Sequence, residues 1–295
     1  MTALAEPVIE PPAKTPAEKI VRFIRKTPIH IGLMAVAVFW LVPTLGLLIT
    51  SFRPRSDIQT TGWWTVFTGN LQFTTQNYAD VIGAQNMLNA FINSLSITIP
   101  ATIIPLILAS LAAFAFAWVS FPFRDTIFLI IVSLLMVPIQ MVLIPLSRLF
   151  GDIGIGGSFL GIWIVHTTFA LPFGIFLLRN FFITLPRDLI EAARIDGASN
   201  WNIFRRVVVP LSVPAIASYG IFQFLWVWND LLIALVFAPR TGQPMTVQVT
   251  TLLGTYASEW NLLAAAAFLI MVVPLIVFFS LQRYFVQGLL AGSVK

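Results

Sequence analysis

The sequence predicts an all-α integral membrane protein with six membrane-spanning helices, and three observations lead to that prediction. Its 295 residues are 58% hydrophobic and 10% charged, whereas soluble domains carry about 25% charged residues. Six stretches lack charge over the roughly 20 residues that a helix needs to cross a bilayer. The basic residues gather on alternate connections between these stretches. A soluble chain of this size could not bury so much apolar surface, so lipid must surround much of it.

The six predicted spans are separated by polar or charged segments. They are Pro28–Phe52, Asn93–Val119, Thr126–Leu146, Ser158–Leu178, Leu211–Phe237 and Leu262–Phe285. Several spans contain proline, which removes a helix hydrogen bond and tends to bend the helix. Neighbouring helices must then satisfy the freed backbone group. These prolines indicate either bent helices around a pathway or ordinary membrane-helix composition.

The ends of the spans divide the chain into a tail and one membrane domain. Residues 1–26 are rich in proline and charge, and we expect a basic cytoplasmic tail there that is disordered over Met1–Ala17. Glu6 and Glu10 stand where a signal peptide would be basic, so no signal peptide is expected. Residues 27–295 are predicted to form a single transmembrane domain. Its first outer segment, Arg53–Ala90, is rich in aromatic residues and is expected at the membrane interface.

The distribution of Lys and Arg predicts the orientation. Only four of the 17 basic residues, Arg53, Arg55, Arg148 and Arg240, lie on the connections of one side. Cytoplasmic connections carry the excess of positive charge, so both termini are expected inside the cell. The basic pI of about 10.0 is then explained by topology, and no nucleic-acid partner is expected.

The connection between the fourth and fifth spans, residues 184–210, is the most informative segment. Pro186 suits a helix start and Gly197 suits a helix end, because glycine accepts the left-handed conformation at little cost. Ser199 is expected to cap a second short helix. Ala192 and Ala193 are small enough for another protein to approach closely. This segment therefore predicts a docking helix on the inner side of the membrane.

The same segment carries a resemblance to a known family. Glu191-Ala192-Ala193, followed by Gly197 and Pro210, resembles the EAA loop of ATP-binding-cassette (ABC) importer permeases. The full run EAARIDGASNWNIFRRVVVPL is similar to the carbohydrate branch, and in particular to the second permease of maltose-type systems. The resemblance implies that the short helix couples the membrane helices to a separate ATPase. The implied coupling residues are Glu191, Ala192, Ala193, Arg194, Asp196 and Gly197.

Other segments carry the same resemblance from the first span onward. They are Asn93-Ser94-Leu95, the run from Pro172 to Arg179, Trp228-Asn229-Asp230 and the C-terminal run from Leu281 to Lys295. The resemblance implies three kinds of protein partner: a homologous second permease, two ATP-binding subunits and an extracytoplasmic solute-binding protein. An alternative for residues 184–210 alone is an amphipathic hairpin on the inner leaflet, with its arginines on anionic lipid.

Several kinds of chemistry have no support in the sequence. No lysine follows a glycine-rich phosphate-binding loop, so ATP and magnesium are expected on the partner ATPase, with no cofactor in this chain. Cysteine is absent and the two histidines are isolated, so no metal site is expected. His166 is predicted to pack within the fourth span. A proton- or sodium-coupled carrier would keep ionisable residues near the bilayer centre, and Asp230 is expected near the outer surface instead.

Polar and aromatic residues within the spans are the candidates for a solute pathway, because polar groups are costly there. Those chosen are Gln140, Gln223, Trp226, Asn229 and Asp230. For the aromatic residue the alternative is packing or lipid contact, and for Asn229 and Asp230 it is a helix cap. The outer segment between spans five and six is polar, and by resemblance it reaches the solute-binding protein as a loop through Gln243, Thr246, Gln248, Thr250 and Thr255.

The expected function is therefore that of a multi-pass, non-catalytic permease subunit in a bacterial inner membrane. The resemblance implies import of a sugar, such as an alpha-glucoside or another di- or oligosaccharide. Two alternatives remain open: an ABC permease for glycerol phosphate or a compatible solute, and an ATP-independent channel or carrier.

Overall fold

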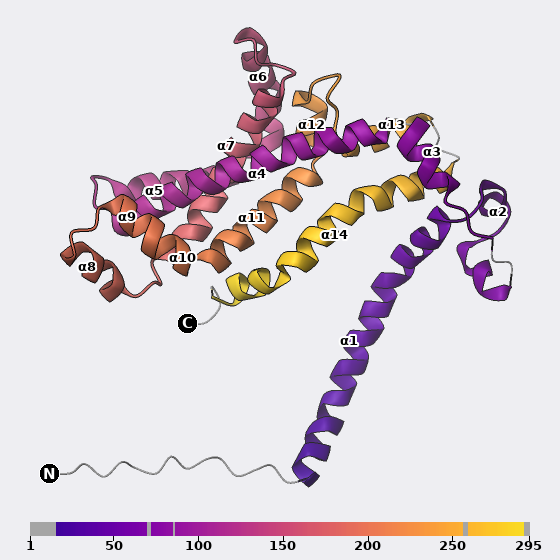
Figure 1. Cartoon of the computed structure of the whole chain (residues 1–295), viewed down its shortest axis with the longest axis horizontal. Helices are drawn as coiled ribbons and strands as arrows, with labels where there is room; N and C mark the ends of the chain where they lie inside the picture. The colour runs from indigo at the N-terminus through magenta and orange to yellow at the C-terminus, as the bar shows by residue number, and fades with distance from the viewer. Residues whose placement is uncertain (1–15, 70–71, 85, 256–258, 292–295) are drawn as a thin grey trace.

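The apolar stretches of the sequence form long helices, which lie side by side over much of the molecule (Figure 1). The computed structural model describes residues 16–69, 72–84, 86–255 and 259–291. In these ranges the chain contains helices and no strand. Four helices are long and apolar enough to span a membrane, and the number rises to six if each of two bent helix pairs is one span.

The four unbroken candidate spans are α1 (Pro16–Ser51), α4 (Met87–Trp118), α7 (Phe159–Phe182) and α14 (Trp260–Ala291). Helix α1 begins at Pro16, so it includes residues 18–26 of the predicted basic tail and the last two residues, 16 and 17, of the part that was expected to be disordered. Residues 1–15 of that predicted tail lie outside the described residues. Short helices α2 (Arg55–Thr60), η1 (Trp63–Thr68) and α3 (Gln76–Ala84) lie in the segment between α1 and α4.

The third predicted span, Thr126–Leu146, is not one straight helix. It is divided into α5 (Arg124–Ser133), η2 (Leu134–Met136) and α6 (Ile139–Asp152), with a bend of 98°. Pro138 stands at the break and begins α6, because its ring prevents the preceding residue from continuing a helix. The bend turns α6 away from the direction in which α4 and α5 run (Figure 1).

The fifth predicted span, Leu211–Phe237, is also broken. Residues 200–211 form α9 (Asn200–Ile203), η3 (Phe204–Val208) and α10 (Val209–Leu211), and they meet α11 (Val213–Trp228) at 79°. A second break separates α11 from α12 (Leu232–Phe237), because the side chain of Asp230 caps the new helix. Helix α8 (Arg187–Ile195) precedes α9, and α13 (Met245–Thr255) lies between α12 and α14.

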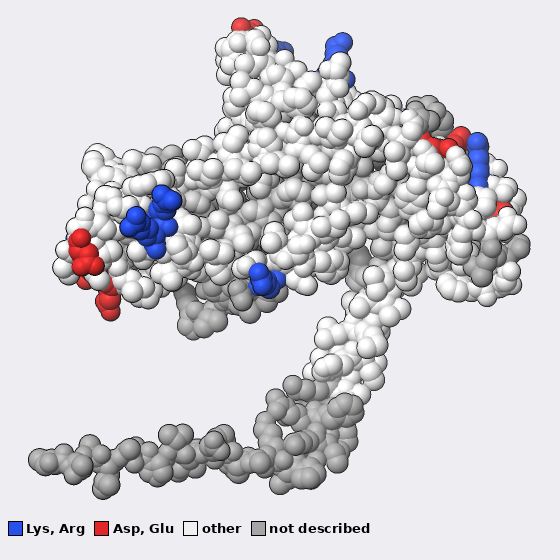
Figure 2. All heavy atoms as spheres, viewed as in Figure 1, with Lys and Arg blue, Asp and Glu red and all other residues white. Residues whose placement is uncertain are grey.

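Helix α4 lies along α7 and α11, and α14 lies on the other side of α11. Buried apolar side chains join these helices in three clusters, one near residues 184–210 and two towards the opposite end of the long helices. Charged side chains gather over α8 and α9 at one end and over α2 and α3 at the other, and the face between these ends shows little charge (Figure 2). A charge-poor band of this kind suits contact with lipid.

Candidate functional site

The coupling segment, residues 184–210, has the two-helix form that its sequence predicted. Helix α8 begins after Pro186 and ends before Gly197, whose φ of +76° lies in the left-handed region. Ser199 caps the next helix, because its Oγ accepts a hydrogen bond of 3.4 Å from the backbone N–H of Asn202. Each of these local features was readable from single residues, because caps depend on neighbours within one turn.

Helix α8 is attached to the body by one face only. Ile190 is buried in the cluster formed with α4, α7 and η3. The predicted coupling residues Glu191, Ala192, Arg194, Asp196 and Gly197 are exposed, and Ala193 is half-buried. The structure adds two exposed apolar residues that the sequence did not single out, Leu189 and Ile195, the latter 87% exposed. An exposed short helix with both charged and apolar residues is a suitable docking element for another protein.

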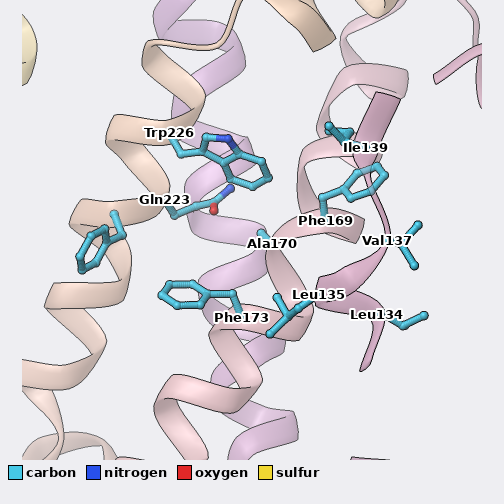
Figure 3. Close-up of a pocket in the computed structure, with 10 residues that line it drawn as sticks. Leu134, Leu135, Val137, Ile139, Phe169, Ala170, Phe173, Gln223 and Trp226 are labelled. Carbon is cyan, nitrogen blue, oxygen red and sulfur yellow. The ribbon is translucent and has the colours of Figure 1, made fainter. Parts of the chain in front are cut away.

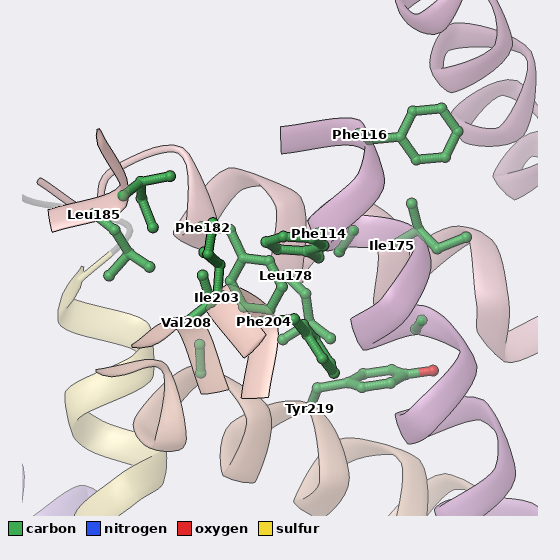
Figure 4. Packing of buried hydrophobic residues seen from close by; sticks show 14 residues of the cluster. Phe114, Phe116, Ile175, Leu178, Phe182, Leu185, Ile203, Phe204, Val208 and Tyr219 are labelled. Carbon is green, nitrogen blue, oxygen red and sulfur yellow. The ribbon is translucent and has the colours of Figure 1, made fainter. Parts of the chain in front are cut away.

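The second helix of the segment anchors α8 to the long helices (Figure 4). Phe204 and Val208 are buried against α4 and α7, and the ring of Phe204 lies 5.4 Å from that of Phe114 in α4. Arg205 and Arg206 are exposed. On α8, Nη2 of Arg194 donates a 2.6 Å hydrogen bond to the carbonyl of Trp118, the last residue of α4. A displacement of α8 would therefore reach α4 directly.

A cavity of about 410 Å³ lies between the α5–α6 bend, α7 and α11 (Figure 3). Its wall is apolar and aromatic, with one amide. The lining residues are Leu134, Leu135, Val137, Ile139, Phe169, Ala170, Phe173, Phe222, Gln223 and Trp226. Two of the predicted pathway residues, Gln223 and Trp226, lie here. Phe169 and Phe173 were not singled out, because only the packing of α7 against α11 brings them to the same wall.

The other predicted pathway residues lie elsewhere. Gln140 is exposed on α6, next to the lining residue Ile139. Asn229 is exposed, and its Nδ2 donates to the carbonyl of Leu225 at 2.8 Å. Asp230 caps α12: its Oδ1 accepts from the N–H of Ile233 at 3.3 Å and its Oδ2 from that of Ala234 at 3.0 Å. Neither Asn229 nor Asp230 lines the cavity.

His166 lies near the same cap and is fully enclosed. Its Nε2 is 3.9 Å from Oδ2 of Asp230, and its ring meets that of Trp226 edge-on at 5.9 Å between centroids. This arrangement fits the packing role predicted for His166. Within the described ranges, no group of three or more His, Asp or Glu residues could hold a metal ion.

The predicted outer loop is largely a helix. Helix α13 occupies Met245–Thr255, because Met245, Val247 and Leu252 are buried against neighbouring helices. The carbonyl of Gln243 accepts from Nδ2 of Asn93 at 3.2 Å, which fastens the start of α13 to α4.

The remaining predicted residues of this segment lie along α13. Oγ1 of Thr246 donates to the carbonyl of Asp230 at 2.7 Å, and Oγ1 of Thr250 donates to that of Val247 at 2.7 Å. Gln248 is half-buried, and the side chain of Thr255 lies outside the described residues. Thr251 and Leu253 form the exposed face.

Comparison with known proteins gives consistent results. Residues 105–290 match the family described as "Binding-protein-dependent transport system inner membrane component". The chain is 54% identical to "Osmoprotective compounds uptake permease protein GgtD" of Synechocystis over 92% of this chain and 93% of that protein. It is 36% identical to "Alpha-glucoside transport system permease protein AglG" of Rhizobium meliloti, over 90% and 96%.

Among solved structures, a chain of a bacterial ABC transporter involved in the import of the acidic polysaccharide alginate is similar, with a TM-score of 0.74. The match covers 93% of this chain and 100% of the other, at 21% identity. At that identity the likeness shows the fold.

Proposed function

The chain belongs to the family of binding-protein-dependent transport system inner membrane components, and we propose from this premise that it forms half of the pathway of an ABC importer for a small neutral sugar. The ATPase is a separate subunit, and this chain contributes no catalytic residue. The observation that carries the proposal is α8, an exposed helix that is fixed to α4 through Ile190 and through the bond from Arg194 to the carbonyl of Trp118. Closure of an ATPase on α8 would move the inner end of α4.

In this proposal each bent helix pair is one span, so that six spans cross a bacterial inner membrane with both termini in the cytoplasm. The charges of the coupling segment then lie inside the cell, as the distribution of Lys and Arg requires. The surface of α13, with the neighbouring predicted residues Gln243 and Thr246, faces outward. It is the surface that we assign to a solute-binding protein. A second permease completes the pathway, and two ATP-binding subunits complete the importer.

The cavity supports a neutral, sugar-like solute. Phe169, Phe173, Phe222 and Trp226 offer flat apolar faces. Gln223 lies between Trp226 and Phe173 (Figure 3). No Lys or Arg is among the ten lining residues. A phosphorylated solute would therefore bring an unpaired charge into an apolar wall, which is costly. This argues against glycerol phosphate.

A second candidate class is an osmoprotective compatible solute. It is favoured by the 54% identity with the permease named for osmoprotective compounds uptake, while the relative named for alpha-glucoside transport favours a glucoside. A small neutral glycoside would be consistent with the names of both relatives.

Uptake of labelled solutes tests the proposal. We expect cells that lack this chain to lose uptake of one sugar or glycoside, tested among maltose, trehalose and sucrose, with glycine betaine and glycerol phosphate in parallel. Loss of glycine betaine alone would overturn the sugar assignment. Failure of the chain to co-purify with any ATP-binding subunit would overturn the importer assignment and favour a channel or carrier.

The coupling role of α8 has its own test in Gly197→Asp. The φ of +76° at Gly197 is unfavourable for residues with a Cβ, and the new carboxylate would lie on the docking face. We expect uptake to be lost while membrane insertion, measured by the amount of chain in the membrane fraction, is retained. Normal uptake by this variant would contradict the coupling role.

A further inference from the structure

Three prolines inside the packed spans have a side-chain donor of another helix nearby: Pro100 and Pro105 in α4, and Pro274 in α14. A fourth, Pro172, lies inside α7. A residue inside an α-helix normally donates its N–H to the carbonyl four residues earlier. Proline has no N–H, so it leaves that carbonyl without its helical partner. The three carbonyls concerned are those of Ser96, Ala101 and Ile270. Within a bilayer no water replaces the lost donor, so a neighbouring helix must do so.

Each of these carbonyls accepts a side-chain N–H from a different helix. Nε1 of Trp163 in α7 donates to Ser96 at 3.0 Å. Nε2 of Gln223 in α11 donates to Ala101 at 3.0 Å.

The third bond has the same form. Nε1 of Trp228, the last residue of α11, donates to Ile270 in α14 at 3.0 Å. A helix offers many carbonyls along each face, and in all three cases the acceptor is the carbonyl four residues before a proline. Because all three donors bind a carbonyl that lacks its helical partner, we infer that these bonds replace the N–H groups that the prolines lack.

We propose that these three hydrogen bonds, which we call joints, hold neighbouring spans together at the prolines. Gln223 and Trp228 are then positioning residues that fix α11 between α4 and α14. Helix α11 supplies Phe222, Gln223 and Trp226 to the cavity wall, so these joints set the position of that wall. The joints themselves follow from geometry alone, and only their effect on uptake rests on the proposed function.

The proposal changes the role of Gln223. Its side chain is buried and one N–H of its amide is used on the carbonyl of Ala101. We assign its effect on the solute to the placement of α11. Trp226, which is partly exposed in the same wall, has no such bond to a freed carbonyl and is the better candidate for solute contact.

A double-mutant cycle tests the joint. Gln223→Met keeps the length of the side chain and removes the N–H. Pro105→Ala returns a backbone N–H to α4, which then satisfies Ala101 from within the helix. We expect Q223M alone to shift the unfolding equilibrium of the purified importer in lipid nanodiscs by about threefold, the average for an interhelical hydrogen bond in a membrane. In the P105A background the same change should have almost no effect.

Uptake supplies the second readout of the cycle. We expect Q223M to raise the KM for the transported sugar about threefold, a typical interhelical bond effect, and Q223M P105A to return it to the parent value. An equal effect of Q223M in both backgrounds, on stability or on KM, would overturn the joint and favour direct solute contact. If the parent importer takes up no sugar, the proposed function is wrong. The stability cycle would still show whether Gln223 and Pro105 form a joint.

The joint at α14 gives an independent cycle if P105A does not assemble. Trp228→Phe removes the indole N–H, and Pro274→Ala restores the donor to Ile270. The expected pattern is the same: a loss of stability in the parent background and none in P274A. Equal losses in the two backgrounds would overturn the proposal at this site.

Discussion

Helices α1 and α4 are equally apolar, yet they meet different surroundings. Only 6% of the most apolar stretch of α1 is buried, against 44% for α4. Helix α4 lies along α7 and α11, whereas α1 diverges from the other helices and meets them at its C-terminal end (Figure 1). Hydropathy therefore shows that a helix suits lipid, and it does not show which helix lies in the core.

The side chains explain the difference. The buried positions of α4 are mostly small, among them Ala101, Ala109 and Ala113, which are fully enclosed. Small residues let helix backbones approach closely in a membrane, where apolar side chains gain nothing by leaving lipid for protein. Helix α1 instead presents large side chains such as Phe39 and Trp40, both more than 70% exposed. Helix packing in this chain thus follows residue size and hydrogen bonds.

The largest expected effect comes from enlarging a buried position of α4. Ala109→Leu would add three carbons where no space is left, and overpacking costs about 1–3 kcal/mol. We expect the purified importer to lose thermal stability or to fail to assemble. The matched control is Ala35→Leu in α1, where Ala35 is exposed and the change should stay within about 0.5 kcal/mol. Equal losses for the two variants would contradict the contrast between the helices.

A smaller effect is expected from removing one indole N–H. Trp163→Phe leaves the carbonyl of Ser96 without the donor that replaces the missing N–H of Pro100. We expect a loss of about 0.6 to 1.7 kcal/mol, from the average to the maximum for an interhelical hydrogen bond in a membrane. Trp40→Phe is the control on α1. Thermal unfolding of both variants in the same nanodiscs measures the difference, and a loss confined to Trp40→Phe would reverse the interpretation.

The sequence predicted the positions of the spans better than their continuity. Charge-free stretches located α1, α4, α7 and α14, because a helix that crosses lipid excludes charge along its length. Proline did not reveal the breaks: α4 continues through Pro100 and Pro105, whereas the chain bends by 98° at Pro138. A proline can remain inside a helix where another helix satisfies the freed carbonyl, as Trp163 and Gln223 do for α4. That partner is distant in sequence and cannot be read locally.

In the candidate site, too, the features that depend on neighbours in sequence were predictable, and those that depend on distant partners were not. The cap at Ser199 and the left-handed Gly197 were predictable, because each depends on residues within one turn. Gln223 and Trp226 were chosen as polar or aromatic residues in a span, and both reach the cavity. Phe169 and Phe173 were missed, since nothing in α7 distinguishes them from lipid-facing aromatics before α11 is in place. Helix α13, in the connection between α12 and α14, was not predicted, because the burial of Met245 and Leu252 depends on distant partners.

The smallest expected effect separates the C-terminal part of α1 from its middle. A methyl group added at Gly46 would lie 2.7 Å from Nε1 of Trp63 in η1, whereas one added at Gly32 would meet nothing within 4 Å. Trp63 is half-buried and can rotate, so Gly46→Ala should cost less than about 1 kcal/mol, below the usual range for overpacking. Gly32→Ala should be neutral or slightly favourable, because alanine favours helix. Thermal unfolding measures the change in stability of both variants. Equal losses would mean that other helices pack against α1 along its whole length, as they do along α4.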